Sequence, residues 1–296
     1  MRVGGLLASL LLALLAGGAV AAARDNAYPG RNGAILYIRD LGGNEPKGGH
    51  IFVTAPDGSG LRDLTPPGFT DVRSAAWSPD GRRIAFSGTG TPRLTQGVFV
   101  MNADGSGLRQ VTRGHLAEIA PTWAPDGKSL AFTSFDRGLF QIFRSRLDGT
   151  RRRVLSNQST NCQNAEWSPT GRLIVFECQL AGGLVIMRAD GSGERRLTTA
   201  ARTIDSSPAW SPDGRTIVFS RATWTYRVGP DGSALTRIAR VVGDRAVSPD
   251  GRWLAMTRFV DEQQELWVLR RDGTGASRIT ATSGVMEFAP DWQPLR

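Results

Sequence analysis

Short apolar runs separated by polar turns recur along most of the chain. In residues 208–221, P-A-W-S-P-D-G-R-T-I-V-F-S-R, one apolar run ends at Trp210, a Ser-Pro-Asp-Gly segment follows, and a second run begins at Ile217. In such a segment proline fixes φ near about −65°, aspartate accepts hydrogen bonds from nearby backbone N–H groups, and glycine tolerates positive φ. The pattern predicts a β-hairpin with the two apolar runs as antiparallel strands.

The hairpin recurs at a regular spacing, which makes internal repetition the main feature of the sequence. Four tryptophans precede such turns and stand 46, 44 and 43 residues apart: Trp77, Trp123, Trp167 and Trp210. A second motif, Asp-Gly after an apolar run, alternates with the first and begins at residues 57, 104, 148, 190, 231 and 272. Each period therefore holds two hairpins, or four strands.

Four strands in about 40 to 50 residues are typical of a β-propeller blade, because radial repetition leaves only short sheet edges. In the second repeat we expect strands, from the innermost outwards, at residues 75–77, 83–87, 98–102 and 108–112. Residues 34–38 look like a second strand without a first, and residues 288–294 like a first strand without a second. The sequence thus predicts an all-β, six-bladed propeller of four-stranded antiparallel blades, closed by N- and C-terminal strands in one composite blade.

The W-S-P-D-G hairpin, followed by an apolar strand and D-G-S-G, resembles the repeat of the TolB-like β-propeller family. The resemblance covers roughly residues 32–296, and we expect the propeller without the N-terminal α/β domain of that family. TolB works in the cell envelope with a peptidoglycan-associated lipoprotein. The resemblance therefore implies a propeller that holds a protein or peptide partner on its loop face.

The first 23 residues have the pattern of a secretory signal peptide, with Arg2, an apolar run at residues 6–16 and small residues up to Ala23. This run is shorter than a membrane-spanning helix requires, although an uncleaved anchor is the alternative. We expect a signal peptide at residues 1–23 and a TolB-like propeller domain at residues 24–296. The mature protein should be an exported monomer, periplasmic or extracellular, without a membrane span.

The chain is basic, with a formal net charge of +9, and Lys47 and Lys128 are its only lysines among 36 basic residues. A basic protein can bind polyanions such as an envelope polymer. Many of these arginines follow turns, however, where a solvated strand end explains them equally well. The run at residues 151–153 allows the same two interpretations. The export signal makes nucleic acid an unsuitable partner.

Two cysteines lie in the fourth hairpin. Cys162 precedes Trp167 by five residues and Cys178 ends the following strand, so folding the hairpin brings them close together. In an oxidising compartment this arrangement favours a disulfide, with free buried thiols or metal ligation as alternatives. A bridge closing a loop of about 16 residues would stabilise the fold by about 3 kcal/mol in the chain-entropy model.

Acidic residues recur where the chain enters the predicted innermost strands. The position five residues before each tryptophan is acidic in three of six repeats, at Glu118, Asp205 and Glu287, and Asp71 and Asp244 lie beside this register. These connections surround the channel mouth, so the five carboxylates could receive a cation, an amine or a basic peptide. Alternatively, they accept backbone N–H bonds or pair with arginines such as Arg73, Arg202 and Arg245.

The sequence gives little support for catalysis. It has two histidines, His50 and His115, and no G-x-S-x-G motif. The Gly-Ser-Gly segments lead into strands rather than helices, which argues against phosphate loops. Calcium-loop spacing is missing. We expect no catalytic residues, no metal and no cofactor.

The function predicted from these observations is an exported, non-catalytic module that binds an envelope or secreted protein or peptide. The alternative is recognition of a carbohydrate or envelope polymer, possibly with hydrolase or lyase activity. Exposed aromatic residues on the loop face would favour sugars, and the candidates there are Phe69, Phe135 and Phe259. An apolar patch framed by charge would favour a protein partner.

Overall fold

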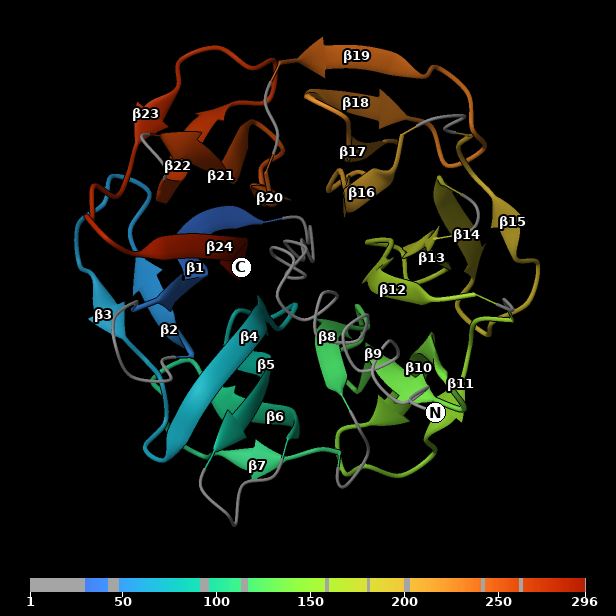
Figure 1. The fold of residues 1–296 in the computed structure, drawn as a ribbon, viewed down its shortest axis with the longest axis horizontal. Helices are drawn as coiled ribbons and strands as arrows, with labels where there is room; N and C mark the ends of the chain where they lie inside the picture. Colours follow the sequence, from blue (N-terminus) through green and yellow to red (C-terminus); the bar gives the residue numbers. More distant parts are fainter. Residues whose placement is uncertain are drawn as a thin grey trace, which may run out of the picture.

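The structure is a computed structural model that describes residues 30–41, 48–90, 96–112, 117–157, 160–179, 182–199, 203–240, 243–260 and 263–295. Every regular element of more than one residue within these ranges is a β-strand. The sheets stand around a common centre, as predicted for a propeller (Figure 1). The predicted signal peptide at residues 1–23 lies outside the described residues. No helix long and apolar enough to cross a membrane occurs in the described ranges.

Four of the sheets contain four antiparallel strands each. The first is made of β4 (Phe69–Trp77), β5 (Arg83–Gly90), β6 (Gly97–Asn102) and β7 (Arg109–Gln110), and the second of β8 (Glu118–Trp123), β9 (Ser129–Asp136), β10 (Leu139–Arg146) and β11 (Arg153–Val154). The third contains β12 (Cys162–Trp167), β13 (Leu173–Cys178), β14 (Leu184–Arg188) and β15 (Arg195–Arg196), and the fourth β16 (Asp205–Trp210), β17 (Ile217–Arg221), β18 (Trp224–Val228) and β19 (Thr236–Ala239). These sheets match the predicted repeats.

The remaining strands form one eight-stranded sheet. It contains β20 (Arg245–Val247), β21 (Trp253–Val260), β22 (Gln263–Arg270), β23 (Ser277–Arg278), β24 (Met286–Leu295), β1 (Arg31–Asp40), β2 (Gly49–Thr54) and β3 (Arg62–Asp63). β24 pairs antiparallel with β1, so strands from both ends of the chain share one sheet, as predicted. The two halves of this sheet are linked by a single parallel pair, Gln264 with Met286.

Side chains within the turn fix each Ser-Pro-Asp-Gly hairpin. In the hairpin between β16 and β17, the Ser211 hydroxyl donates to Asp213 Oδ1 at 2.6 Å and accepts from the Thr216 N–H at 2.9 Å. Asp213 Oδ1 also accepts from the Arg215 N–H at 3.0 Å, and Gly214 has φ of 68°. The sequence motif thus supplies the hydrogen bonds of its own turn.

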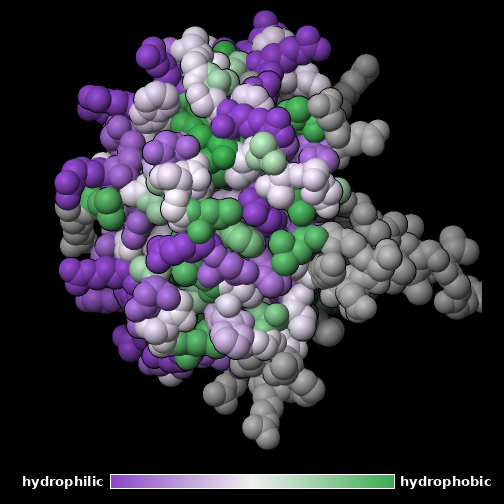
Figure 2. Space-filling view, turned by 90° about the vertical axis from the view of Figure 1, so that its left-hand side faces the viewer, coloured by the Kyte–Doolittle hydropathy of each residue, from purple (hydrophilic) through white to green (hydrophobic). Residues whose placement is uncertain are grey.

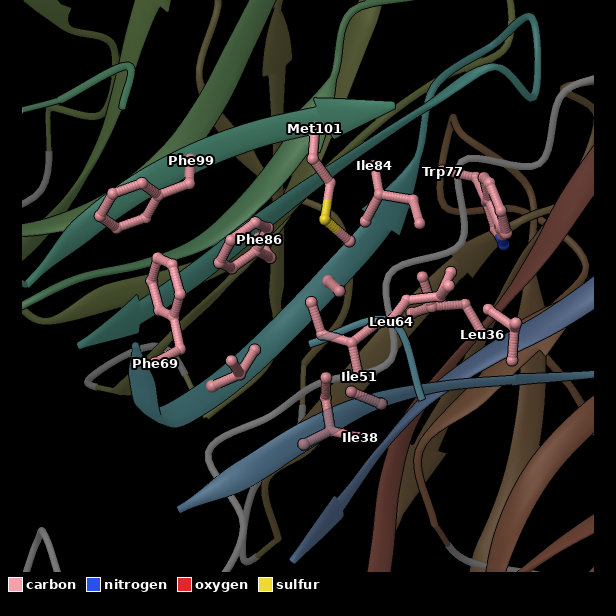
Figure 3. Close-up of a cluster of buried hydrophobic side chains, with 14 residues drawn as sticks. Leu36, Ile38, Ile51, Leu64, Phe69, Trp77, Ile84, Phe86, Phe99 and Met101 are labelled. Carbon is pink, nitrogen blue, oxygen red and sulfur yellow. The ribbon is translucent and has the colours of Figure 1, made fainter. Parts of the chain in front are cut away.

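Buried tryptophans fill the contacts between neighbouring sheets. Each of three indole Nε1–H groups donates to a backbone carbonyl of the preceding repeat: Trp123 to Ala76 at 3.1 Å, Trp210 to Glu166 at 3.4 Å, and Trp292 to Ala246 at 3.2 Å. In Figure 3, Trp77 and Phe86 face Leu36 and Ile51 across the contact between β4–β6 and β1–β2. Full burial of such side chains stabilises the fold by roughly 1.5–3 kcal/mol each, so repeated Trp contacts hold the ring together.

The outer wall is mixed in character. On the side that carries β3 and β23, hydrophobic residues form small areas among hydrophilic ones (Figure 2). One of the exposed hydrophobic residues of the molecule is Leu61, directly before β3. Single exposed apolar residues of this kind are normal on protein surfaces and carry no functional meaning on their own.

Candidate functional site

The innermost strands share a bulge that connects neighbouring sheets. Four residues at equivalent positions have φ between 50° and 66°: Ala120, Asn164, Ser207 and Ala289. Their N–H groups donate to side chains of the preceding repeat, namely to Ser74 at 3.3 Å, Thr133 at 3.2 Å, Glu177 at 2.7 Å and Asp244 at 3.2 Å. The bulges therefore build a chain of hydrogen bonds around much of the centre of the ring.

We call these hydrogen-bonded residues around the centre of the ring the central layer. Two of the predicted carboxylates belong to it, and each is held in an ion pair. Asp205, the first residue of β16, is buried and accepts from Arg221 Nε and Nη2, both at 2.6 Å. Glu287 in β24 is also buried, and its Oε1 accepts from Arg39 Nε at 3.0 Å and Nη2 at 2.7 Å. Each pair joins two neighbouring antiparallel strands, β16 with β17 and β24 with β1.

Threonine hydroxyls occupy the second oxygen of the same two carboxylates. Thr198 donates to Asp205 Oδ2 at 2.5 Å, and Thr280 donates to Glu287 Oε2. The Oε2 atom of Glu287 also accepts from the Leu266 N–H at 3.0 Å. Both oxygens of Asp205 and of Glu287 are thus occupied within the protein.

The other three predicted carboxylates also have internal partners. Asp71 pairs with Arg73 at 2.7 Å, and Asp244 accepts from the Ser207 hydroxyl at 3.4 Å and from the Ala289 N–H. Glu118 is fully buried and pairs with Arg152 at 3.3 Å, while its Oε2 has no partner among the described groups. Asp205 pairs with Arg221, whereas Arg202 lies outside the described residues. These contacts are all internal to the protein and do not test for a ligand, so ligand binding by the five carboxylates stays a prediction.

The two cysteines occupy the same register as the ion pairs. Cys162 lies opposite Cys178, just as Asp205 lies opposite Arg221 and Glu287 opposite Arg39. The cysteines form a disulfide, with an S–S distance of 2.05 Å and 4.2 Å between the Cα atoms. The disulfide therefore takes the place of an ion pair in the third four-stranded sheet, and the predicted pairing is confirmed.

One acidic residue of the central layer escaped the sequence analysis. Glu177 in β13 accepts from the Ser207 N–H at 2.7 Å and from Asn164 Nδ2 at 3.1 Å. Burial raises its pKa from 4.5 to about 7, and the negative charge of Asp244 acts in the same direction. The available signal was that Glu177 replaces the Ser or Thr found at this point of four other repeats, at residues 87, 133, 220 and 257.

The sheet that begins with β20 departs from the repeat at two positions. Val247 stands where the other repeats have tryptophan, and Arg245 stands where they have alanine or proline. Arg245 is fully buried, donates to Ser220 Oγ and to the Gly243 carbonyl, and has no partner for Nε or Nη1 among the described groups. Its burial lowers its pKa to about 10. In this repeat, the buried guanidinium of Arg245 thus occurs together with Val247, which replaces the tryptophan of the other repeats.

Three exposed apolar residues lie at one end of the eight-stranded sheet. Phe259 is 70% exposed and lies opposite Gln264, Gln264 pairs with Met286, and Met286, 50% exposed, lies opposite Asp40. Leu41, which is 38% exposed, follows Asp40 directly. We call Leu41, Phe259 and Met286 the loop-face patch, because they lie where the second-to-third-strand and inter-repeat connections lie.

The other predicted aromatic candidates are less accessible. Phe69 is buried and packs edge-on against Phe86 and Phe99, and Phe135 is partly buried against Phe140. Of the three rings predicted as candidates for sugar binding, Phe259 alone is largely exposed. Among the described residues, no group of three or more His, Cys, Asp or Glu side chains could hold a metal ion. His115 lies outside the described residues.

Comparison with known proteins agrees with the propeller architecture. TolB from Acinetobacter baumannii has a similar structure, with a TM-score of 0.75 and 20% sequence identity, over 88% of this chain and 67% of that chain. The uncharacterized peptidase YuxL of Bacillus subtilis is 27% identical over 219 residues, 72% of this chain and 32% of that protein. The Tol-Pal system protein TolB of Desulfosudis oleivorans is 30% identical over 118 residues, 39% of this chain and 26% of that protein.

The alignments thus span about a third or less of these two curated relatives. A family model, the TolB beta propeller domain, matches residues 68–243, which is more than half of this chain. The matched residues include the four four-stranded sheets and the turns between their first and second strands, which read Ser-Pro-Asp-Gly in two sheets and Ala-Pro-Asp-Gly or Ser-Pro-Thr-Gly in the other two. This chain belongs to the TolB beta propeller domain family.

Proposed function

We propose that the protein is an exported, six-bladed, non-catalytic propeller that holds a protein or peptide partner on its loop face. The observation that carries the proposal is the loop-face patch. Large apolar side chains of β21 and β24, with β22 between these strands, and the residue after β1 are exposed at the end of the sheet where β24 pairs with β1. Large apolar side chains exposed near one another on a surface are typical of sites where another protein binds.

Phe259 is the best candidate for the centre of the contact. It is the most exposed of the large hydrophobic side chains described, and aromatic residues supply much of the binding energy at protein interfaces. Charged residues occur close by in the same sheet, since Arg258 precedes Phe259 in β21 and Asp40 lies opposite Met286. An apolar centre with a charged rim is the usual anatomy of a protein interface.

Several observations favour binding over catalysis. The predicted carboxylates are occupied by arginines, threonines or backbone N–H groups, so a new role would require these bonds to break. The alignment with the peptidase relative YuxL covers 32% of that protein, so we do not assign a peptidase activity to this chain. TolB relatives suggest a cell-envelope location and a protein partner, which fit the predicted export.

Site-specific photo-crosslinking tests the proposal. A photoreactive phenylalanine analogue at position 259 should crosslink one defined protein in an envelope extract from the source organism. The same analogue at Leu61, which is 48% exposed beside β3, serves as the control position. In the protein that carries the analogue at position 259, replacing Met286 by serine should abolish the crosslink, because Met286 belongs to the same patch.

Crosslinking of the same proteins from positions 259 and 61 would contradict a dedicated partner site. Binding to a panel of neutral glycans, abolished by Phe259→Ser, would instead support the carbohydrate alternative, in which the exposed ring stacks on sugars. Hydrolysis or cleavage of any such ligand would refute the non-catalytic assignment.

A further inference from the structure

A large basic groove lies between the sheet β4–β7 and the sheet β8–β11. Its volume is about 1050 Å³, and its lining includes eight basic side chains and two acidic ones, a formal net charge of +6. The cations come from β5, β7 and β10, from the turn between β8 and β9, and from residues 151–153.

Four of the cations are available to a ligand. Arg109, Lys128, Arg151 and Arg153 are exposed, and none has a side-chain hydrogen bond or ion pair within the described part of the chain. The two acidic side chains of the groove, Asp126 and Asp148, accept backbone N–H bonds of their own turns, from residues 128 and 150. The groove therefore presents unpaired positive charge.

Two further arginines are fixed in the floor and wall of the groove. Arg152 lies over the ring of Phe143 at 4.1 Å and donates to Ser134 Oγ at 3.0 Å. Arg144 lies over the ring of Trp167 at 5.2 Å and donates to Ser129 Oγ from Nη2 at 3.0 Å. Stacked guanidinium groups lose little further freedom when an anion binds, so this part of the site is preorganised.

The groove arises from departures of one repeat from the others. Four repeats have glycine at the position of Arg151: residues 60, 107, 193 and 275. All four have positive φ, and Arg151 keeps that backbone with φ of 55°. A non-glycine residue in this conformation costs roughly 1–2 kcal/mol. Arg152 similarly replaces the leucine found at Leu61, Leu108 and Leu235. The aligned Ala234 has a similar φ of 54° without a charge, so the two arginines, rather than the backbone conformation, distinguish this repeat.

We propose that this groove binds a linear oligoanion whose charges are phosphate groups. Guanidinium groups match phosphate oxygens with paired N–H donors. A phosphate chain carries a charge on each short unit, whereas a uronate chain carries one per sugar ring, so phosphates neutralise more of these clustered cations. None of the lining residues is aromatic, so sugar rings and nucleobases would find no surface for stacking.

Binding of inorganic polyphosphate chains of defined length, measured by calorimetry at several salt concentrations, tests the proposal. The triple variant Arg109→Ser/Arg151→Gly/Arg153→Ser removes three unpaired charges and leaves Arg152 on Glu118. This variant should bind polyphosphate at least about tenfold more weakly. The slope of log K against log[salt] should become shallower by about one for each phosphate contact that is lost. Tripolyphosphate should compete with the longer chain.

A matched triple variant, Arg62→Ser/Arg82→Ser/Arg172→Ser, removes the same charge from exposed positions outside the groove. It should bind polyphosphate nearly as well as the unmodified protein. Equal loss in both variants would show attraction to net charge alone and overturn the proposal. Absence of saturable binding, or equal affinity for an oligogalacturonate of the same total charge, would overturn it as well.

The groove and the loop-face patch are separate, so their tests are independent. The groove variants should leave the photo-crosslink from position 259 unchanged. Loss of polyphosphate binding together with that crosslink would mean that the variant had unfolded, which circular dichroism of the same sample reveals. Such a sample would be replaced by the single variants Arg109→Ser and Arg153→Ser, each of which should weaken binding by itself.

Discussion

Replacing Glu177 with glutamine should change how the stability of the protein depends on pH. Glu177 is buried in the central layer, and its pKa rises from 4.5 to about 7 on folding. The folded state therefore holds the proton more tightly than the unfolded state. This contribution to stability is fully present below about pH 4.5 and is lost as the pH rises through about 7.

The expected magnitude follows from the difference between these two pKa values. They differ by about 2.5, and each pKa unit corresponds to about 1.4 kcal/mol, so the loss amounts to about 3 kcal/mol. Glutamine has nearly the same shape and does not titrate in this range. Its carbonyl can accept from Ser207, and its amide can donate to Asn164 Oδ1, which has no partner among the described groups.

Denaturant unfolding followed by tryptophan fluorescence, at a series of pH values, measures the effect. The free energy of unfolding of Glu177→Gln should rise relative to that of the unmodified protein by about 3 kcal/mol between acidic and mildly alkaline pH. Asp244→Asn removes the neighbouring negative charge and should reduce this pH dependence. Parallel pH curves for the Glu177→Gln variant and the unmodified protein would refute the reasoning.

Three further predictions concern stability. Arg151→Gly should raise the free energy of unfolding by about 1 kcal/mol because it relieves a left-handed φ. Gly60→Ala places a methyl group in the same left-handed conformation, with no atom within 4 Å of it, and should lower the free energy of unfolding by about as much. Urea unfolding of both variants checks this prediction. Replacing Cys162 and Cys178 together by serine should cost about 3 kcal/mol, for a sequence separation of 16, and reducing agent should then have no further effect on the unfolding midpoint. Removing residues 287–296 should abolish cooperative thermal unfolding, because most of β24 and its pairing with β1 are lost; a truncated protein that melts like the full chain would contradict the role of this pairing.

Repetition explains why the fold could be predicted from the sequence. Each Ser-Pro-Asp-Gly turn carries its own hydrogen bonds, so the strand pairs are encoded locally. The pairing of β24 with β1 followed from half-repeats at the two ends. The cysteines could be paired because Cys162 and Cys178 lie at nearly equal distances from the turn, five and four residues beyond the Trp167–Ile174 pair, and a register shift makes up the difference.

Contacts between repeats were harder to predict, because they depend on how far a side chain reaches. Glu177 bonds to Ser207 in the next sheet, and its altered pKa comes from burial that spacing does not reveal. The basic groove required Arg109 of one sheet to face the arginines of another. Both sites were nevertheless visible as departures from the repeat, since a charged residue replaced Ser, Gly or Leu at an aligned position.

The affinity of the crosslinked partner, once purified, tests the central claim most directly. Titration against the double variant Phe259→Ser/Met286→Ser should show binding weakened by about a hundredfold or more, as expected when an aromatic centre and its neighbour are lost. Leu61→Ser, changed on the outer wall beside β3, should bind as the unmodified protein does. Unchanged affinity of the double variant would contradict the loop-face patch as the partner site.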